Sequence, residues 1–301
     1  MDSDLAFGWK PELEDKHDLS DISLATLPCS LPAESDIPKD MNPTWFTQDN
    51  QGVWPFCHAH MRTGIVECLY WLATKGQTQN FSRYYAAITD MKMDGDDSQP
   101  EGASIGGSLK ASIKYGEAVE SLMPYPPLQP NPPTNNINRW CQQHYSNKIA
   151  DTVSQDATHR GIESIIPNLR TYKDVDNALV SGRTAVGFGL YWTTGWASFR
   201  GKSVVESGVG GQVLGGHAVF FFGWETHNNV RYPILHNSHL GWGTNMRIAV
   251  APSIVDSILR NSPFGAFAVT NIKKDDPTPI SQPWDWLTPE AFKDKPVNPF
   301  N

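Results

Sequence analysis

The chain has 301 residues, and 24 Lys and Arg against 32 Asp and Glu give it a formal charge of −8. No cluster of Lys and Arg is present to bind a phosphate backbone, and the longest apolar run, Ala218 to Phe222, is far below the roughly 18 residues that cross a bilayer. We therefore expect no nucleic-acid partner and no membrane anchor. The 39% apolar content predicts one large domain or two lobes.

The start of the chain and its cysteines bear on where the protein resides. Residues 1–4 are acidic, where a secretory signal peptide is basic and then apolar, so no signal peptide is expected. A reducing compartment follows, in which disulfides are rare. The four cysteines form no CxxC pair and no zinc-ligand spacing, so we expect no structural metal. They are Cys29, Cys57, Cys68 and Cys141.

The first half of the chain has helical periodicity after a polar start. Residues 1–40 carry several prolines and predict an extended arm in front of a main domain at 41–272. Within that domain a helical lobe is expected at about 41–125. One helix is predicted from Pro55 to Lys75-Gly76, because its apolar residues recur at spacings of 4, 4 and 3. A second helix is predicted from Ser104, as N-cap, to Gly116.

The second half is rich in strand-forming residues. Six prolines between Met123 and Pro133 predict an extended crossover into a β lobe at about 160–272. That lobe is expected to begin with a short helix at Thr171–Leu179 and to continue with strands. The predicted strands are Ala185–Trp192, Ala218–Trp224, Tyr232–His236, Met246–Val250 and Gly265–Ile272. Together the two halves predict an α+β protein of two lobes.

A cysteine at a predicted helix start is the most informative residue for chemistry. The unpaired N–H groups and positive dipole end of a helix favour a thiolate at Cys57, which is the nucleophilic form. A nucleophile also needs a base, and His217 follows two glycines at the start of a strand. Twenty residues later, Asn237 ends the next predicted strand, where its amide could orient the imidazole.

These residues resemble the active-site motifs of the papain-like cysteine peptidases, in a bacterial or viral type. Gln51 precedes Cys57 by six positions, as the family's glutamine precedes its nucleophile. Gly215-Gly216-His217-Ala218-Val219 resembles the histidine strand, and His236-Asn237-Ser238 with Gly241-Trp242-Gly243 resembles the asparagine motif. Two further segments are similar to this family: Phe7-Gly8-Trp9-Lys10-Pro11 near the start, and the block from Glu101 to Tyr125.

The resemblance implies a fold and a reaction. A helical lobe and a β-barrel-like lobe would enclose a cleft, in which Cys57, His217 and Asn237 form the catalytic triad and Gln51 contributes to the oxyanion hole. The substrate would be a peptide or protein, and no cofactor is needed. No segment before Gln51 resembles the family's propeptide.

The sequence also departs from the family pattern around the nucleophile and the asparagine. The usual disulfide beside the nucleophile is missing, since Trp54-Pro55-Phe56 precedes Cys57, and His239 stands where the family has a tryptophan. A second reading therefore makes the chain a structural or binding subunit of a viral or bacterial assembly. A third makes it a related amidase that cuts cell-wall peptides.

Two further features belong to these alternatives. The tail at 273–301 has six prolines among its aromatics, so it cannot bury them by folding on itself. We expect it to lie across another surface, with Trp284 and Trp286 as anchors, and the tail and the arm would then join the chain to an assembly. The protein is accordingly expected in the cytoplasm or in a particle such as a virion.

Several histidines also raise a metal site as an alternative, although His58 and His60 point to different helix faces.

Overall fold

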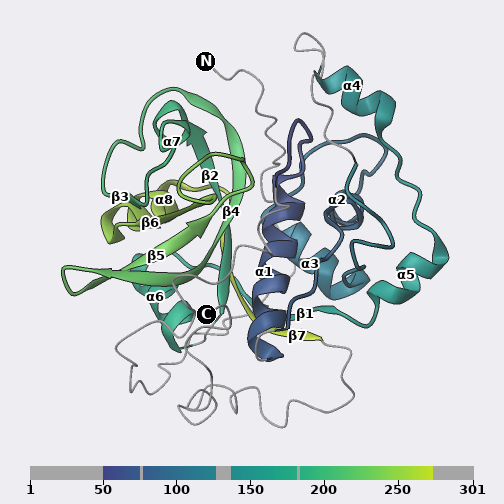
Figure 1. Cartoon of the computed structure of the whole chain (residues 1–301), viewed down its shortest axis with the longest axis horizontal. Helices are drawn as coiled ribbons and strands as arrows, with labels where there is room; N and C mark the ends of the chain where they lie inside the picture. Colours follow the sequence, from purple (N-terminus) through teal and green to yellow (C-terminus); the bar gives the residue numbers. More distant parts are fainter. Residues whose placement is uncertain (1–49, 75–76, 127–136, 182–183, 274–301) are drawn as a thin grey trace, which may run out of the picture.

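The computed structural model describes residues 50–74, 77–126, 137–181 and 184–273. It contains two lobes, one of helices and one built on a sheet, with helix α1 (Cys57–Ala73) between them (Figure 1). This arrangement confirms the predicted α+β class. The arm at 1–40 and the tail from 274, with Trp284 and Trp286, lie outside the described residues. No helix in the described part of the chain is long and apolar enough to span a membrane.

Two helices of the helical lobe form where the spacing of apolar residues predicts them. The first predicted helix is α1, which ends at Ala73, and the second is α3 (Ile105–Tyr115). Ser104 caps α3 as expected, because its hydroxyl accepts from the Gly107 N–H at 3.0 Å. Three further helices complete this side of the molecule: α2 (Arg83–Met93), α4 (Ile137–His144) and α5 (Asp151–Ala157).

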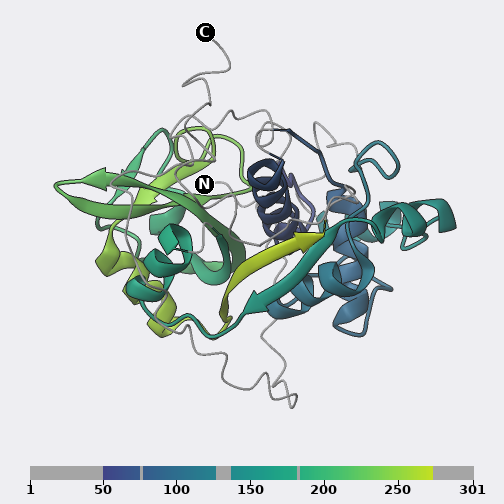
Figure 2. The ribbon, with the colours of Figure 1, turned by 90° about the horizontal axis from the view of Figure 1, so that it is seen from below.

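The β lobe is built on a seven-stranded sheet in the order β1-β7-β2-β4-β5-β6-β3. All its strand pairs are antiparallel except β3 with β6. The strands are β1 (Gly161–Ile166), β2 (Ala185–Thr193), β3 (Val204–Val205), β4 (Val213–His227), β5 (Val230–His236), β6 (Arg247–Val250) and β7 (Ala266–Lys273). β1 and β7 pair antiparallel and extend between the β lobe and the helices (Figure 2).

Alternation along β4 divides the core into two layers. Ala218, Phe220 and Phe222 pack with α1 in one hydrophobic cluster, whereas Val219 and Phe221 pack in a second cluster on the other face. This is the period of two that a strand buried on both faces requires. Three helices belong to the second side: α6 (Tyr172–Ser181), α7 (Thr194–Ala197) and α8 (Pro252–Asn261). Cys57 belongs to the first of these clusters, so the face of β4 that packs on α1 is also the face nearer to Cys57.

Candidate active site

Cys57 is the first residue of α1 and is fully buried. The N-cap residue, Phe56, offers no side-chain hydrogen bond to the helix, and no acidic residue lies in the first turn. The positive end of the helix dipole is therefore not neutralised locally by a side chain of that turn. Such an end lowers the cost of a thiolate at this position.

A buried ion network fixes the start of α1 in the helical lobe. His58, which follows the cysteine, has its Nδ1 2.8 Å from Asp90 Oδ2 on α2. The other oxygen of Asp90 accepts from Arg62, and Arg62 Nε donates to Glu117 Oε1 at 2.6 Å. All four side chains are buried. Because the partners come from α1, α2 and the segment after α3, the network ties the first turn of α1 to the rest of the helical lobe.

His217 and Asn237 meet as the sequence predicted, and their hydrogen bond defines a single tautomer. His217 Nε2 lies 2.7 Å from Asn237 Oδ1, and the backbone N–H of Ser238 donates to the same oxygen at 2.7 Å. A backbone N–H only donates, so the atom facing it must be the amide oxygen. His217 Nε2 must then carry its proton, and Nδ1 of the neutral ring is the basic nitrogen.

Gln51 is tied to the segment that follows Asn237. Its backbone N–H donates to Ser238 O at 3.0 Å, and Ser238 Oγ donates to Gln51 Oε1 at 2.5 Å. Gln51 Nε2 in turn donates one of its two hydrogens to Trp54 O at 3.0 Å. A carbonyl only accepts, so the amide orientation of Gln51 is defined as well. Tyr125 Oη also donates to Gln51 O at 3.1 Å.

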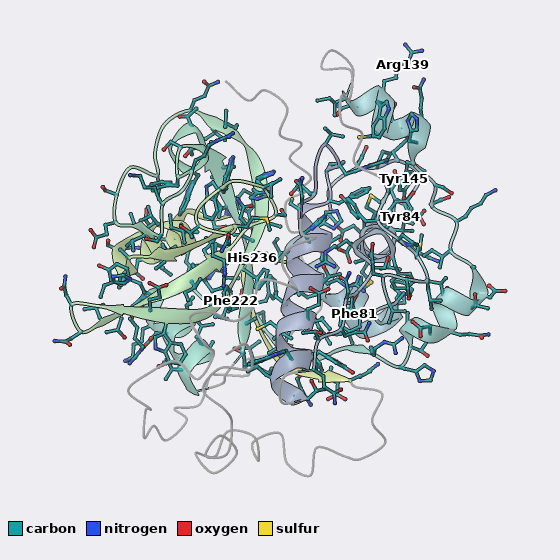
Figure 3. The ribbon with its side chains drawn as sticks, viewed as in Figure 1. Phe81, Tyr84, Arg139, Tyr145, Phe222 and His236 are labelled. Carbon is teal, nitrogen blue, oxygen red and sulfur yellow. The ribbon has the colours of Figure 1, made fainter. Side chains whose placement is uncertain are left out.

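The same contacts bring α1 against the end of β5. His60 and Met61, one helical turn after Cys57, line a small pocket together with Ala218, Asn237 and Ser238. His236 lines it too, and Figure 3 shows His236 and Phe222 on the side of the β lobe that faces α1. The Gln51 segment, the first turns of α1 and the His217–Asn237 pair therefore converge where the lobes meet.

Aromatic rings enclose the His217 imidazole on two sides. Trp192 meets it edge to face, with ring centroids 4.8 Å apart and planes at 67°, and His239 stacks on it at 4.6 Å and 12°. Burial lowers the pKa of His217 to about 4, although the hydrogen bond that its ring donates to Asn237 raises it. Near neutral pH the ring is therefore an uncharged base.

The cysteines and histidines in the described ranges form no cluster suited to a metal ion. Cys57, Cys68 and Cys141 form no disulfide with one another, and Cys29 lies outside the described residues. Within the described ranges, no three His, Cys, Asp or Glu side chains are arranged to hold a metal ion. His58 and His60 do point to different surroundings, since one contacts Asp90 and the other Tyr125.

Two neighbours of the site were not identified as site residues from the sequence. In the sequence, Ser238 is only the residue after Asn237 in the motif, yet its hydroxyl bonds Gln51, which lies 187 residues earlier. Trp192 reaches His217 because Leu190 pairs with His217 in the β2–β4 register and Trp192 projects from the same face. A pattern of strand residues gives no signal for either contact.

Solved structures of other proteins support the fold described above. No protein-family model and no curated protein matches the sequence. Among solved structures, xylellain, a cysteine protease from Xylella fastidiosa, is similar with a TM-score of 0.67 and 18% identity, over 89% of this chain and 97% of its own. Procathepsin B S9 from Trypanosoma congolense gives 0.63 and 17%, over 88% and 86%.

A third similar structure is digestive procathepsin L 3 from the larval midgut of Tenebrio molitor. Its TM-score is 0.57 at 15% identity, over 89% of this chain and 77% of its own. At such identities the likeness concerns the backbone arrangement, and an activity must be argued from the site itself. The chain therefore has the fold of the papain-like cysteine proteases.

Proposed function

We propose that the protein is a cysteine peptidase that hydrolyses peptide bonds through Cys57, His217 and Asn237, with Gln51 in the oxyanion hole. The observation that carries this proposal is the 2.7 Å hydrogen bond between His217 Nε2 and Asn237 Oδ1. It leaves Nδ1 of the ring as the basic nitrogen. A neutral imidazole held in one tautomer is what a general base requires, and we infer that the thiol it serves is the helix-terminal Cys57.

The reaction would proceed through an acyl-enzyme. Cys57 Sγ attacks the scissile carbonyl carbon while its proton passes to His217 Nδ1, and the carbonyl electron pair moves to the oxygen. Gln51 Nε2 and the Cys57 N–H stabilise that oxyanion. When it collapses, the C–N bond breaks and His217 gives its proton to the leaving amine. A water, deprotonated by His217, then hydrolyses the thioester.

The low pKa of His217 affects the first of these steps. In a buried site the neutral thiol and neutral imidazole are favoured over a preformed ion pair, because desolvation disfavours both charges. Proton transfer then accompanies the attack. Substrate binding that brings developing charge to the oxyanion donors would stabilise the imidazolium at that moment.

The test uses covalent labelling, because a substrate is not needed for it. The full chain is incubated with an epoxide that alkylates papain-like cysteines, and the labelled residue is mapped by mass spectrometry. We expect label on Cys57 and none on Cys68 or Cys141, because desolvation raises the pKa of these two thiols and the proposed mechanism gives neither a base. Cys57→Ala should lose both label and peptidase activity, while Cys141→Ala should keep them. Peptidase activity of wild-type rate in Cys57→Ala would rule the proposal out.

One observation favours a second function. Gln51, Cys57 and His217 have no exposed surface and Asn237 has 1%. A peptide cannot reach a nucleophile that stays covered, so a non-catalytic subunit that keeps the fold is the alternative. Absence of epoxide label on Cys57 in the native chain, with label appearing on all cysteines after unfolding, would support that alternative. Cell-wall peptides belong in the substrate panel for an active protein.

A further inference from the structure

Two aromatic side chains attach the segment between Gln51 and Cys57 to the helical lobe. Trp54 and Phe56 are fully buried, and their rings stack with centroids 5.3 Å apart and planes at 12°. Trp140 of α4 contacts the Trp54 ring at 5.4 Å and 58°. The indole nitrogen of Trp54 is buried without a hydrogen-bond partner among the described residues, so packing holds this ring. Its position therefore depends on rings such as those of Phe56 and Trp140.

The backbone of Trp54 bonds the glutamine of the proposed oxyanion hole. Its carbonyl accepts from Gln51 Nε2 at 3.0 Å, and its N–H donates to Gln51 O at 3.3 Å. Gly52 closes this turn with a φ of 58°, in the left-handed region that glycine adopts without strain. Residues 51–56 contain no cysteine, so no disulfide anchors the turn. Because the ring and the carbonyl of Trp54 share one Cα, a shift of the ring also moves the acceptor of Gln51 Nε2.

We propose that Trp54 and Trp140 are positioning residues for the oxyanion hole: α4 presents Trp140 to the Trp54 ring, and this ring fixes the carbonyl that orients Gln51 Nε2. The inference rests on the proposed function, in which Gln51 stabilises the oxyanion. A donor is effective when its geometry is set before the reaction, because reorganising it during the reaction costs part of the stabilisation. A helix without a reacting group thus acts on the rate.

Phe56 has further ring contacts that separate the two oxyanion donors. It is the N-cap of α1, directly before Cys57, and its ring meets Tyr84 at 6.3 Å and Tyr145 at 6.4 Å. Figure 3 shows these two tyrosines close together in the helical lobe. They remain in place when Trp140 is changed. Removing the Trp140 ring should therefore release the glutamine donor and leave the start of α1, with the Cys57 N–H and thiol, where it is.

The first arm of the test needs no enzymatic activity. In the full-length chain labelled with ¹⁵N-glutamine, NMR follows the side-chain amide of Gln51, which is identified by its absence in Gln51→Ala. We expect slow exchange of its bonded hydrogen with water in the parent and in Trp140→Phe, and exchange about ten-fold faster in Trp140→Ala. Parent-like exchange in Trp140→Ala would overturn the proposal.

Two further variants make this arm decisive. Arg139→Ala changes an exposed residue of the same helix and should exchange like the parent (Figure 3). Equally fast exchange in Arg139→Ala and Trp140→Ala would mean that α4 as a whole is disturbed, against a specific role of the ring. If Trp140→Ala does not fold, Trp140→Leu replaces it, and its exchange should again be faster than that of Trp140→Phe.

The second arm distinguishes the donor from the nucleophile. Methyl methanethiosulfonate has no carbonyl, so its reaction needs no oxyanion hole. The Cys57 sulfur bonds to the methylthio sulfur, and methanesulfinic acid leaves with the thiol proton. The rate of this reaction in Trp140→Ala should stay within about two-fold of the parent, whereas kcat for a peptide should fall about ten-fold with KM within about two-fold. Equal losses in the two rates would overturn the proposal, and so would a change confined to KM.

A peptide aldehyde gives an independent measure of the oxyanion hole. Its carbonyl carbon bonds the Cys57 sulfur and its oxygen takes the place of the oxyanion, so Trp140→Ala should weaken inhibition by about the same factor as kcat. Trp140→Phe should restore both, and unchanged inhibition in Trp140→Ala would contradict the proposal. If the parent cleaves no peptide while the exchange pattern holds, the proposed function fails and the positioning of Gln51 by Trp54 and Trp140 stands.

Discussion

Ser238 connects two parts of the proposed site although it has no chemical step of its own. Its Oγ donates to Gln51 Oε1 at 2.5 Å, while its N–H donates to Asn237 Oδ1 at 2.7 Å. One residue thus fixes both amide groups in the orientation that the mechanism needs. The oxygen of the Gln51 amide is thereby occupied, and Nε2, the only part of the amide that can donate, bonds Trp54 O.

Ser238→Ala should therefore lower kcat with little change in KM. Removing an oxyanion donor outright costs about 10²–10³ in kcat, so losing only its orientation is expected to cost about ten-fold. The measurement is kcat and KM on a peptide substrate, with Gln51→Ala as the larger reference effect. Ser108→Ala, at an equally buried serine on α3, is the control and should keep wild-type kcat. Unchanged kcat in Ser238→Ala would contradict the proposed role of Gln51.

The residue types of the site could be predicted because short motifs carry them. A helix start before Cys57, glycines before His217 and a strand end before Asn237 are local features of the sequence. The contacts of Ser238 and Trp192 are not local, since strand pairing and the loop after β5 create them. Burial of the site, which makes His217 a neutral base, also depends on the packed molecule.

Helix α1 approaches β4 at one residue without a side chain. A Cβ added to Gly64 would lie 2.6 Å from Cε1 and 2.8 Å from Cζ of the Phe220 ring. Phe220 is itself fixed, because it is buried and lies 5.1 Å from the ring of His236. The close approach of helix and strand thus depends on this glycine, two turns after Cys57.

Gly64→Ala should destabilise the fold even though alanine is the better helix former. The helix gains roughly 0.5–1 kcal/mol from the change, but overpacking a core costs typically about 1–3 kcal/mol. We expect a net loss of about 1 kcal/mol in the free energy of unfolding, measured by urea denaturation.

Gly210→Ala provides the matched comparison, since no atom lies within 4 Å of its added Cβ. Its free energy of unfolding should remain within about 1 kcal/mol of wild type. Equal stability of the two variants would show that the α1–β4 packing adapts to the extra methyl group.

The elements that could be predicted are those whose apolar spacing is undisturbed. α1, α3 and five strands follow such spacing, and β4 extends beyond its predicted range because its pairing continues through glycines and polar residues. α2 was missed because its buried face contains Arg83 and Asp90, which are neutralised by residues of α1. β1 was missed because its partner β7 is about a hundred residues away and the register shifts twice.

At the scale of the whole molecule, four of the buried histidines in the described ranges lie near the junction of the lobes and outside the ion network of His58. They are His60, His217, His236 and His239, with exposures of 2%, 0%, 2% and 6%. Burial lowers the pKa of two of them, His217 and His239, below the usual value of about 6.5 at which the unfolded chain binds protons. The packing that assembles the site therefore carries a sensitivity to acid.

For His217 the sign and the window of this effect can be worked out. Its folded pKa, about 4, is below its unfolded value, so between pH 6.5 and 4 the unfolded state binds more protons. Stability is then fully present above pH 6.5 and falls with pH through this window. A shift of 2.5 units corresponds to roughly 3 kcal/mol at pH 4, as an upper figure for a fully buried ring.

The test is the free energy of unfolding as a function of pH in wild type and in His217→Gln. The carboxylates titrate in the same range in both proteins, so their contribution cancels in the difference between the two curves. The curves should run parallel above pH 7 and converge by up to roughly 3 kcal/mol as the pH falls to 4, since the glutamine variant has no proton to exclude. His144→Gln, at an exposed histidine on α4, should follow wild type throughout. If His217→Gln also follows wild type at every pH, the imidazole is hydrated in solution, and the buried neutral base that the mechanism uses is absent.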